Sequence, residues 1–452
     1  MLSLLTVGIY YGLNEFDALT HSNVAVMYIV LPGIGGGTVG GGVYDLLTRR
    51  VSSPLATVSK ICVRDLTKPR SFTVDPQTCT MTDKIDDVLN DDTLNCVVEV
   101  MGGTGIAKDV VLRALGKGKH VVTANKALIA EHLPEIQAAI LSAPGGPSFA
   151  YEAAVCGAIP IINTLQTCYE GDVVTSVMGI CNGTTNFMLC KMEGGEDYGE
   201  VLKEAQDLGF AEADPTADVE GHDVRAKISI LAKLAYGVTV PISAIPTKGI
   251  SSVTSVDFEY AKSMGCTIKL IGTAARTSEH GEHDGPLSVY VAPKMVPITH
   301  VMGGIGGAGN AVAVTSENMG MAAYTGPGAG RYPTANSIVA DVMRIARGNQ
   351  GEAFPKSAEL ELSTDYESAF YIRISISDGL GIIKSVGACA EKSGVSISQI
   401  LQNTISDREA VDFCVTTEVA LLSQVKMMCE ELKGLSFVKK EPSYMPIQEK
   451  PE

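Results

Sequence analysis

The sequence predicts an α/β protein built of three parts, and three observations lead to this fold class. The chain has 452 residues, which at roughly 100 to 200 residues per domain corresponds to about three domains. Its composition, with 45% hydrophobic and 19% charged residues, is that of a globular protein. In the first third of the chain, candidate strands alternate with candidate helices, an order typical of a doubly wound parallel sheet.

The first part starts with an apolar run that ends at Val30 and leads through a glycine-rich turn into a helix ending near Arg49. Further strands are expected at residues 55–63, 95–101 and 120–124. Residues 142–147 (SAPGGP) have the composition of a linker. The first part is therefore placed at residues 1–148 and is expected to hold a Rossmann-type sheet.

The second part, residues 149–324, is expected to be an α+β unit. Strand-like stretches at 173–180 and 287–291 alternate with a helical pattern at 223–236 that stops at Gly237. A glycine-rich stretch then leads into a helix at 334–347, and residues 325–350 are expected to return to the first part. The polar residues that follow form a second linker.

The third part, residues 366–441, is predicted to have the order βαββαβ of a ferredoxin-like domain. A strand at 370–376 precedes a helix that ends at Ser393, and another strand-like run precedes a helix at 417–433. The part is small and poor in clustered ionisable groups. It is therefore assigned to regulation or assembly rather than to catalysis.

Charge and cysteine content limit the partners and the compartment. The net charge of −16 argues against nucleic acid and against an anionic membrane surface, because phosphate groups would be repelled. Residues 18–44 are apolar enough to span a bilayer, but seven glycines between Gly33 and Gly42 favour a buried strand followed by a turn. Eleven cysteines without a CxxC pair favour reduced thiols, and so a cytoplasmic protein without a disulfide framework or zinc site.

Three glycines after the first strand have the spacing of a dinucleotide-binding turn. Gly35, Gly37 and Gly40 form a GxGxxG pattern, and Thr38 and Val39 lie within it. In such a turn, free backbone N–H groups and the helix dipole bind the pyrophosphate. An ordinary glycine-rich turn is the alternative, but the position between a strand and a helix favours a nicotinamide dinucleotide.

The end of the second strand bears on which dinucleotide is bound. Arg64 follows this strand, with Lys68 and Arg70 nearby, and basic residues there accommodate the 2′-phosphate of NADP. Asp65 is adjacent and leaves NAD open, because an acidic residue at this place holds the ribose 2′-hydroxyl. The sequence therefore predicts a preference for NADP.

An ionisable pair lies on the apolar side of the helix predicted at 223–236. Asp223 and Lys227 fall within or at the edge of its apolar arc. A surface ion pair, the alternative, would lie on the polar face. A pair placed towards the core is costly unless it lines a cleft, so we expect a site in which Lys227 exchanges a proton with an alcohol or aldehyde oxygen.

Several stretches together resemble one family, and the resemblance runs through nearly the whole chain. The sequence resembles homoserine dehydrogenase of the monofunctional kind with a C-terminal ACT domain. The resembling stretches are residues 35–43 (GGGTVGGGV), 121–128 (VVTANKAL), 151–159 (YEAAVCGAI), 182–187 (NGTTNF), 209–227 and 325–335 (TGPGAGRYPTA).

The resemblance implies reversible NAD(P)-dependent interconversion of L-homoserine and L-aspartate 4-semialdehyde, on the route to threonine, methionine and isoleucine. It implies that Lys227 donates a proton to the aldehyde oxygen, and that Glu212 binds the amino end of the substrate. Asp218 and Asp223 would position substrate and lysine. The remaining substrate-binding residues that it implies are Asn182, Gly183 and Thr184.

The resemblance also assigns residues near the nicotinamide. Lys126 corresponds to the family lysine close to nicotinamide and substrate, where a solvated lysine is the alternative. Gly103 and Thr104 end a strand at the carboxyl edge of the sheet, where dinucleotides bind, and Gly328 belongs to the loop that returns to the cofactor. The second part would then be the catalytic and dimerisation domain.

A monovalent cation, sodium in the family, is implied beside the cofactor. The resemblance maps it onto Glu152 and the backbone carbonyls of Val155, Gly157 and Ile159, and hard oxygen ligands suit such an ion. A buried glutamate that caps a helix is the alternative.

The resemblance has two further consequences for regulation and assembly. The ACT resemblance rests on residues 378–383 (DGLGII) and implies an amino-acid effector such as threonine. A homodimer or higher homo-oligomer is also expected. One departure concerns residues 27–32 (MYIVLP), which lie between the start of the first strand and the glycines, so the register of that strand stays open.

Two rival functions remain at this point. In one, Cys156 or Cys181 is the nucleophile of a cysteine-dependent aldehyde dehydrogenase, although neither has a histidine beside it in sequence. In the other, the chain is an NADPH-linked amino-acid sensor with an inactive site. The joint presence of Lys227, Asp223 and Glu212 argues against the sensor.

Overall fold

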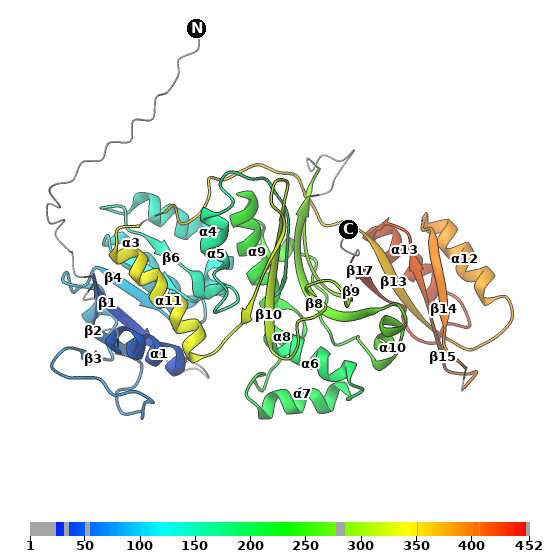
Figure 1. Cartoon of the computed structure of the whole chain (residues 1–452), viewed down its shortest axis with the longest axis horizontal. Coiled ribbons are helices and arrows are strands. Elements are labelled where there is room, and N and C mark those ends of the chain that lie inside the picture. Colours follow the sequence, from blue (N-terminus) through cyan, green and yellow to red (C-terminus); the bar gives the residue numbers. More distant parts are fainter. Residues whose placement is uncertain are drawn as a thin grey trace, which may run out of the picture.

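The chain folds around two β-sheets that lie one after the other along its long axis (Figure 1). The computed structural model describes residues 24–30, 36–49, 55–276, 285–349, 351–405 and 407–448. A six-stranded sheet belongs to the amino-terminal part, and an eleven-stranded sheet runs through the rest. No helix in these ranges is both long and apolar enough to cross a bilayer.

The six-stranded sheet has the order of a Rossmann fold. Its strands are β1 (Val24–Val30), β2 (Ala56–Val63), β3 (Thr80–Thr82), β4 (Cys96–Glu99), β5 (His120–Thr123) and β6 (Phe149–Ala150). They are all parallel and follow the order β3-β2-β1-β4-β5-β6, so the predicted doubly wound sheet is confirmed. The sequence did not reveal β3 and β6, because three and two residues are too short to show a period.

The open question about the first strand has a structural answer. β1 pairs with both β2 and β4, and its register with β2 shifts between Val26 and Met27. The shift lies where the inserted residues begin, and Met27 to Val30 continue the same strand. Pro32, Gly33 and Gly35 lie outside the described residues.

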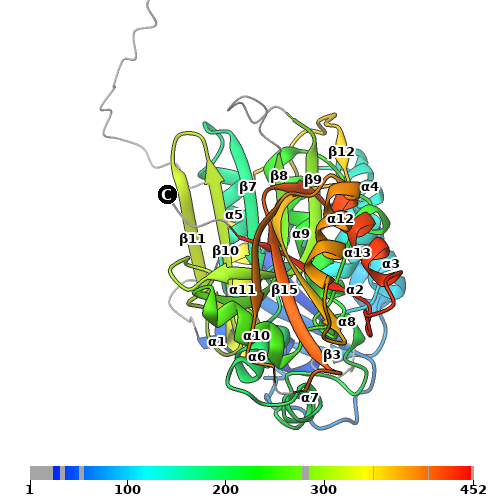
Figure 2. The ribbon, with the colours of Figure 1, turned by 90° about the vertical axis from the view of Figure 1, so that its right-hand side faces the viewer.

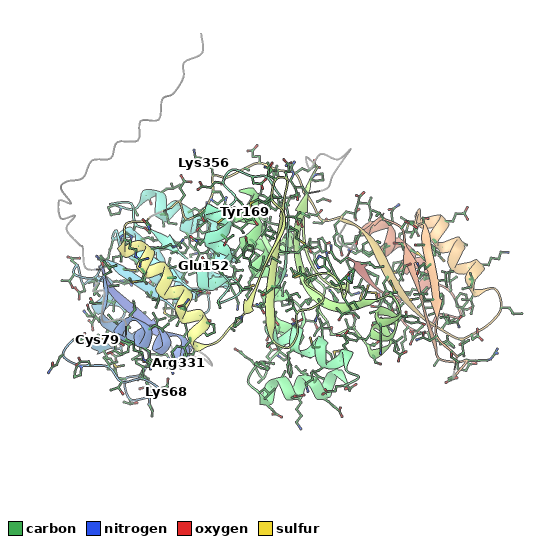
Figure 3. All side chains as sticks on the ribbon, viewed as in Figure 1. Lys68, Cys79, Glu152, Tyr169, Arg331 and Lys356 are labelled. Carbon is green, nitrogen blue, oxygen red and sulfur yellow. The ribbon has the colours of Figure 1, made fainter. Side chains whose placement is uncertain are left out.

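In the described residues, the helices around this sheet are α1 (Gly36–Arg49), α2 (Asp86–Leu89), α3 (Gly105–Gly116), α4 (Lys126–Ser142) and the returning α11 (Arg331–Ala346). α1 and α11 pack closely, because a Cβ at Gly42 would lie 2.9 Å from the carbonyl oxygen of Arg331. Arg331, labelled in Figure 3, also forms an ion pair with Asp45 at 2.8 Å. The predicted helix at 334–347 thus begins three residues earlier, since Pro333 fits a first helical turn.

The larger sheet starts with strands of the middle part. These are β7 (Val174–Ile180), β8 (Cys266–Arg276), β9 (Leu287–Pro297), β10 (Gly309–Ser316) and β11 (Gly320–Pro327), in the antiparallel order β11-β10-β7-β8-β9. The helical segments of this part are η1 (Glu152–Ala154), α5 (Ile161–Thr167), α6 (Gly183–Glu193), α7 (Tyr198–Asp207), α8 (Thr216–Val219), α9 (His222–Tyr236), η2 (Ile242–Ala244) and α10 (Ser255–Ser263).

Helix α9 packs directly on β8, which confirms the helix predicted at 223–236. A Cβ at Gly272 of β8 would lie 2.9 Å from Val224 and 3.1 Å from Ile228. Both of these α9 side chains are fully buried. The close approach places the apolar side of α9, and with it Asp223 and Lys227, inside the protein.

The C-terminal part continues the larger sheet. It holds β12 (Leu362–Ser363), β13 (Glu367–Ile376), α12 (Ile382–Ser393), β14 (Ile397–Gln402), β15 (Val411–Thr417), β16 (Ala420–Leu421), α13 (Leu422–Lys433) and β17 (Ser443–Ile447). The strand order β9-β17-β13-β15-β14 joins this part to the strands of the middle part, and Figure 2 shows β15, α12 and α13 in front of β8 and β9. The βαββαβ order is confirmed, although the strands do not form a sheet of their own.

One helix boundary in this part was predicted wrongly. The helix expected at 417–433 begins at Leu422, because the residues up to Thr417 complete β15. A buried ion pair also ties the part to α10: Arg373 Nε lies 2.8 Å from Asp257 Oδ1, and the Tyr371 hydroxyl donates to the same oxygen.

Candidate active site

A cleft of about 410 Å³ lies at the carboxyl ends of β4 and β5, close to the point where the strand order of the Rossmann sheet reverses. Its walls come from α1, the loops after β4 and β5, α9 and the returning loop before α11. They include Val39, Gly102, Gly103, Lys126, Cys156, Gly157, Lys227, Gly328 and Thr334. A larger cavity of about 760 Å³ contains none of the predicted catalytic, substrate or cofactor residues.

The amine of Lys227 lies in this cleft among acidic and carbonyl oxygens. Lys227 is only 7% exposed, and its Nζ donates to Asp223 Oδ2 at 2.7 Å and to the Cys181 carbonyl oxygen at 2.6 Å. Asp223 Oδ1 in turn forms an ion pair with Lys126 Nζ at 2.7 Å. One carboxylate therefore holds two lysines, one from the Rossmann part and one from α9.

The charges of this group stabilise one another. Burial alone would lower the pKa of Lys227, but the negative charge of Asp223 outweighs it and holds the pKa above its usual value. Burial alone would raise the pKa of Asp223, but the charges of Lys126 and Lys227 hold it well below its usual range. Lys227 is therefore an ammonium group and Asp223 a carboxylate at neutral pH.

Asn182 joins the two acidic residues of the predicted substrate site. It is the N-cap of α6, where its Oδ1 accepts from the Thr185 backbone N–H at 2.8 Å. Its Nδ2 donates to Asp218 Oδ1 at 2.6 Å and to Asp223 Oδ2 at 2.9 Å. Burial raises the pKa of Asp218, and the capped amide orients both carboxylates.

The other predicted substrate residues differ in how close they come to this group. Gly183 follows Asn182, and a Cβ there would lie 2.7 Å from the Ala308 carbonyl oxygen. The Thr184 hydroxyl donates to the Phe210 carbonyl oxygen at 2.7 Å and so fixes the adjoining loop. Glu212 is exposed, and within the described ranges its carboxylate forms no hydrogen bond or ion pair. The structure does not bring Glu212 into contact with Lys227 and Asp223.

The predicted cofactor residues of the glycine turn lie in a helix. Gly37, Thr38, Val39 and Gly40 belong to the first turns of α1, which begins at Gly36. Gly37 and Gly40 thus lie where the glycine pattern opens a helix, and their role in binding the dinucleotide stays a prediction. Val39 lines the cleft, and the N-terminal end of α1 follows β1 as a dinucleotide site requires.

Backbone geometry shapes the cleft at the end of β4. Gly102 and Gly103 have φ of 73° and 72°, in the left-handed region that glycine adopts freely. The Gly103 carbonyl accepts from Asn125 Nδ2 at 2.7 Å, while Asn125 caps α4. Thr104 is the N-cap residue of α3. Asn125 was not singled out from the sequence, and neither was the helix that it caps.

The end of β2 carries the residues that bear on cofactor preference. Asp65 is exposed, and its Oδ1 accepts from the backbone N–H and the hydroxyl of Thr67, while Arg70 donates to the Asp65 carbonyl oxygen at 2.6 Å. Arg64 is exposed and forms no ion pair within the part of the chain described. Lys68, labelled in Figure 3, lies on the same outer loop.

Two loops meet backbone to backbone in the wall of the cleft. Gly157 has φ of 49°, and a Cβ there would lie 2.5 Å from the Gly328 carbonyl oxygen. Gly328 rests on the side chain of Asn310, and a Cβ would lie 2.2 Å from the Asn310 amide nitrogen. Asn310 is 1% exposed and was not identified from the sequence, because nothing local in β10 indicates this contact.

Glu152 has the contacts of a helix cap. Labelled in Figure 3, it is 4% exposed, and its carboxylate accepts from the backbone N–H groups of Ile162 and Asn163, each at 2.9 Å. Its own N–H donates to Asp341 at 2.8 Å. Burial, with the charge of Asp341 nearby, raises the pKa of Glu152 to about 7. The Gly157 carbonyl accepts from the Ser337 hydroxyl.

Cys156 also lines the cleft, with Cys181 beside it. A hydrogen bond from Cys181 lowers the pKa of the Cys156 thiol. A cysteine-dependent aldehyde dehydrogenase needs a base beside such a thiol, and the described residues that line the cleft include no histidine.

Comparison with known proteins identifies families and relatives that the chain resembles. The profile of "Homoserine dehydrogenase" matches residues 160–343, and that of "Homoserine dehydrogenase, NAD binding domain" matches residues 35–142. The homoserine dehydrogenase of Bacillus subtilis (strain 168) is 37% identical over 421 residues, which cover 90% of this chain and 95% of that protein.

Solved structures agree with the sequence comparison. A homoserine dehydrogenase from Thiobacillus denitrificans has a TM-score of 0.84 at 32% identity, covering 94% of this chain and 98% of that one. A hyperthermophilic archaeal homoserine dehydrogenase in complex with NADPH has a TM-score of 0.58 at 22% identity, covering 73% of this chain and 99% of that one. At this identity the likeness shows only that the two chains share a fold. With its Rossmann sheet, its cleft and these relatives, the chain belongs to the homoserine dehydrogenase family of NAD(P)-dependent oxidoreductases.

Proposed function

We propose that Lys227 is the proton donor when L-aspartate 4-semialdehyde is reduced to L-homoserine. The observation that carries this role is the position of its ammonium group in the cleft. Two of the three N–H donors are used by Asp223 and Cys181, which leaves one for a substrate oxygen. A nicotinamide dinucleotide held in this cleft would supply the hydride, and Lys227 would give a proton to the carbonyl oxygen of the substrate. The test is the turnover of Lys227→Ala with semialdehyde and NADPH.

The acidic residues and Lys126 would bind and orient the substrate. Asp218 and Asp223 are held by one amide and lie beside Lys227, so they provide negative charge for the substrate ammonium group. Lys126 is the more exposed lysine on Asp223 and lines the same cleft, where it would attract the substrate carboxylate. In this proposal Glu212 approaches the amino end of the substrate only when substrate is bound.

The proposed preference for NADP is supported by Arg64, which is exposed and unpaired in the part of the chain described. Arg64→Ala should lower kcat/KM for NADPH about tenfold and change that for NADH little, because a charged hydrogen bond to the 2′-phosphate is lost. Lys84→Ala removes the same charge from another exposed site in this part and serves as the control. Equal or NAD-favouring values for the wild type would contradict the preference.

A monovalent cation, sodium, is proposed beside Glu152. Glu152 and Asp341 are both buried, and Arg344 is paired with Asp341 at 2.6 Å. Burial raises the pKa of both carboxyl groups, and a cation beside them would stabilise their charged forms. The carbonyls of Val155, Gly157 and Ile159 belong to the loop that follows Glu152 and would complete an oxygen ligand set.

The C-terminal part is proposed to be an ACT regulatory unit that responds to threonine. Its βαββαβ order and the loop at 378–383 support this role. Threonine at millimolar concentration should inhibit turnover and raise the midpoint of thermal unfolding, because a ligand that binds the native state stabilises it. Serine and valine serve as controls. If threonine changes neither quantity, the part serves assembly alone, in the homodimer that we also propose.

A further inference from the structure

Lys248 lies where β17 of the C-terminal part runs beside β9 of the middle part. Its Nζ donates to the Tyr444 carbonyl oxygen at 2.7 Å and stands 4.2 Å from the centroid of the Tyr444 ring. Its backbone N–H donates to Val291 of β9 at 2.9 Å. The residue therefore links the segment between η2 and α10 to β9 and β17, which are neighbouring strands of the larger sheet.

The segment 247–250 supports the turn between α8 and α9. The Ile250 N–H donates to the Val219 carbonyl oxygen at 2.8 Å. A Cβ at Gly249 would lie 2.2 Å from that same oxygen, so the two backbones are in direct contact. Gly221, the N-cap of α9, has φ of 78°, and a Cβ there would lie 3.3 Å from the Thr247 side chain. The turn cannot shift without moving this segment.

The turn carries the acidic group of the active site. Asp218 lies in α8, just before this turn, and Asp223 lies in the first turn of α9, just after it. Asn182 holds both carboxylates, and Asp223 holds Lys227. A displacement of residues 247–250 would therefore change the spacing between the acidic residues and the lysine.

We propose that Lys248 is a positioning residue for the homoserine dehydrogenase reaction, which by anchoring residues 247–250 to β17 holds Asp218 and Asp223 at their spacing around Lys227. The inference rests on the proposed roles of these three residues. It gives the C-terminal part a direct physical connection to the active site, through one side chain and one backbone contact.

Burial and the neighbouring groups together set the protonation state of Lys248. Burial lowers its pKa to about 8, and the charged or titratable groups that face it are Cys429, Asp257, Arg373 and Glu441. Asp257 is already paired with Arg373, and within the described ranges Lys248 has no ion pair of its own. The aromatic ring and the carbonyl of Tyr444 therefore provide its nearest compensation.

Lys248→Met keeps the aliphatic packing of the side chain but removes its charge and its donor. We expect kcat/KM for the semialdehyde to fall about tenfold, mainly through a higher KM, while KM for NADPH stays the same. Lys248→Arg should recover most of the loss. The wild-type pH profile should contain a change near pH 8 that Lys248→Met lacks. Lys262→Met, at an exposed lysine of α10, is the matched control.

A second pair of variants tests the partner. Tyr444→Leu removes the ring and should resemble Lys248→Met, whereas Tyr444→Phe keeps the ring and should resemble the wild type. The double variant Tyr444→Leu/Lys248→Met should lose less than the sum of the two single losses, since both substitutions remove the same contact between the amine and the ring. The inference is wrong if Lys248→Met lowers only the unfolding temperature and leaves KM and the pH profile unchanged. Loss of activity in Lys227→Ala alongside a normal Lys248→Met would leave the proposed function intact and reject only this inference.

Discussion

Lys227→Ala should reduce the rate of semialdehyde reduction by about a thousandfold, because general acid catalysis by a positioned side chain typically contributes 10² to 10⁴. Affinity for NADPH should stay within about twofold, since Lys227 reaches the substrate side of the cleft in the proposed mechanism. The measurements are steady-state turnover, followed by NADPH absorbance, and NADPH binding followed by its fluorescence.

A matched control separates catalysis from structure on the same helix. Lys233 is a second fully buried lysine of α9, and its Nζ donates to the Gly237 carbonyl oxygen at 2.8 Å. Lys233→Met should lower stability without a comparable loss of kcat. A Lys227→Ala enzyme that keeps more than a tenth of wild-type turnover would overturn the proposed role.

The protonation state of Lys227 predicts different pH profiles for the two directions. Its pKa lies above the usual value, so the ammonium form that reduction needs is present throughout the neutral range. Oxidation of homoserine needs the neutral amine, and its kcat/KM should rise about tenfold per pH unit across that range. This difference tests the same role of Lys227, because Lys227→Ala should abolish the rise of kcat/KM with pH.

Asp223→Asn should lower both activity and stability. The carboxylate is the shared partner of Lys126 and Lys227, and removing one member of a buried ion pair costs about 3 to 5 kcal/mol of unfolding free energy. Without it, burial would lower the pKa of Lys227, and the oxidation profile should move to lower pH. Urea denaturation and pH-dependent kinetics measure the two effects.

The stability difference should also depend on pH with a defined sign. The folded pKa of Asp223 is lowered, so its stabilising contribution is present above the unfolded pKa of about 3.9 and is lost as the pH falls towards the folded value. The wild type should therefore exceed Asp223→Asn in stability at neutral pH, and the part of this excess that comes from Asp223 should shrink as the pH falls below about 4. Asp218→Asn, which keeps an oxygen that can accept from Asn182 and breaks no ion pair, should cost less. Equal costs for both variants would contradict the shared-partner geometry.

Local patterns in the sequence predicted much of the fold and one half of the active site. The alternation of strands and helices predicted the Rossmann sheet, because burial on both faces of a parallel sheet leaves continuous apolar runs. The apolar arc of α9 showed that Asp223 and Lys227 would be buried together, since residues four apart share a helix face. These patterns could not predict very short strands such as β3 or the first residue of α13.

What the patterns left open was every contact between residues far apart in the chain. Lys126 and Asp223 meet only because the sheet places the end of β5 opposite α9, and Asn310 reaches Gly328 only through the pairing of β10 with β11. The exposure of Glu212 and the contact of Lys248 with β17 likewise depend on how elements far apart in the chain pack together. A chain encodes burial locally, through periodicity and caps, whereas the partner that a buried charge meets depends on how whole elements stack. That is why Lys227 and Asp223 could be chosen from the sequence, whereas their contacts with Lys126 and with the Cys181 carbonyl could not.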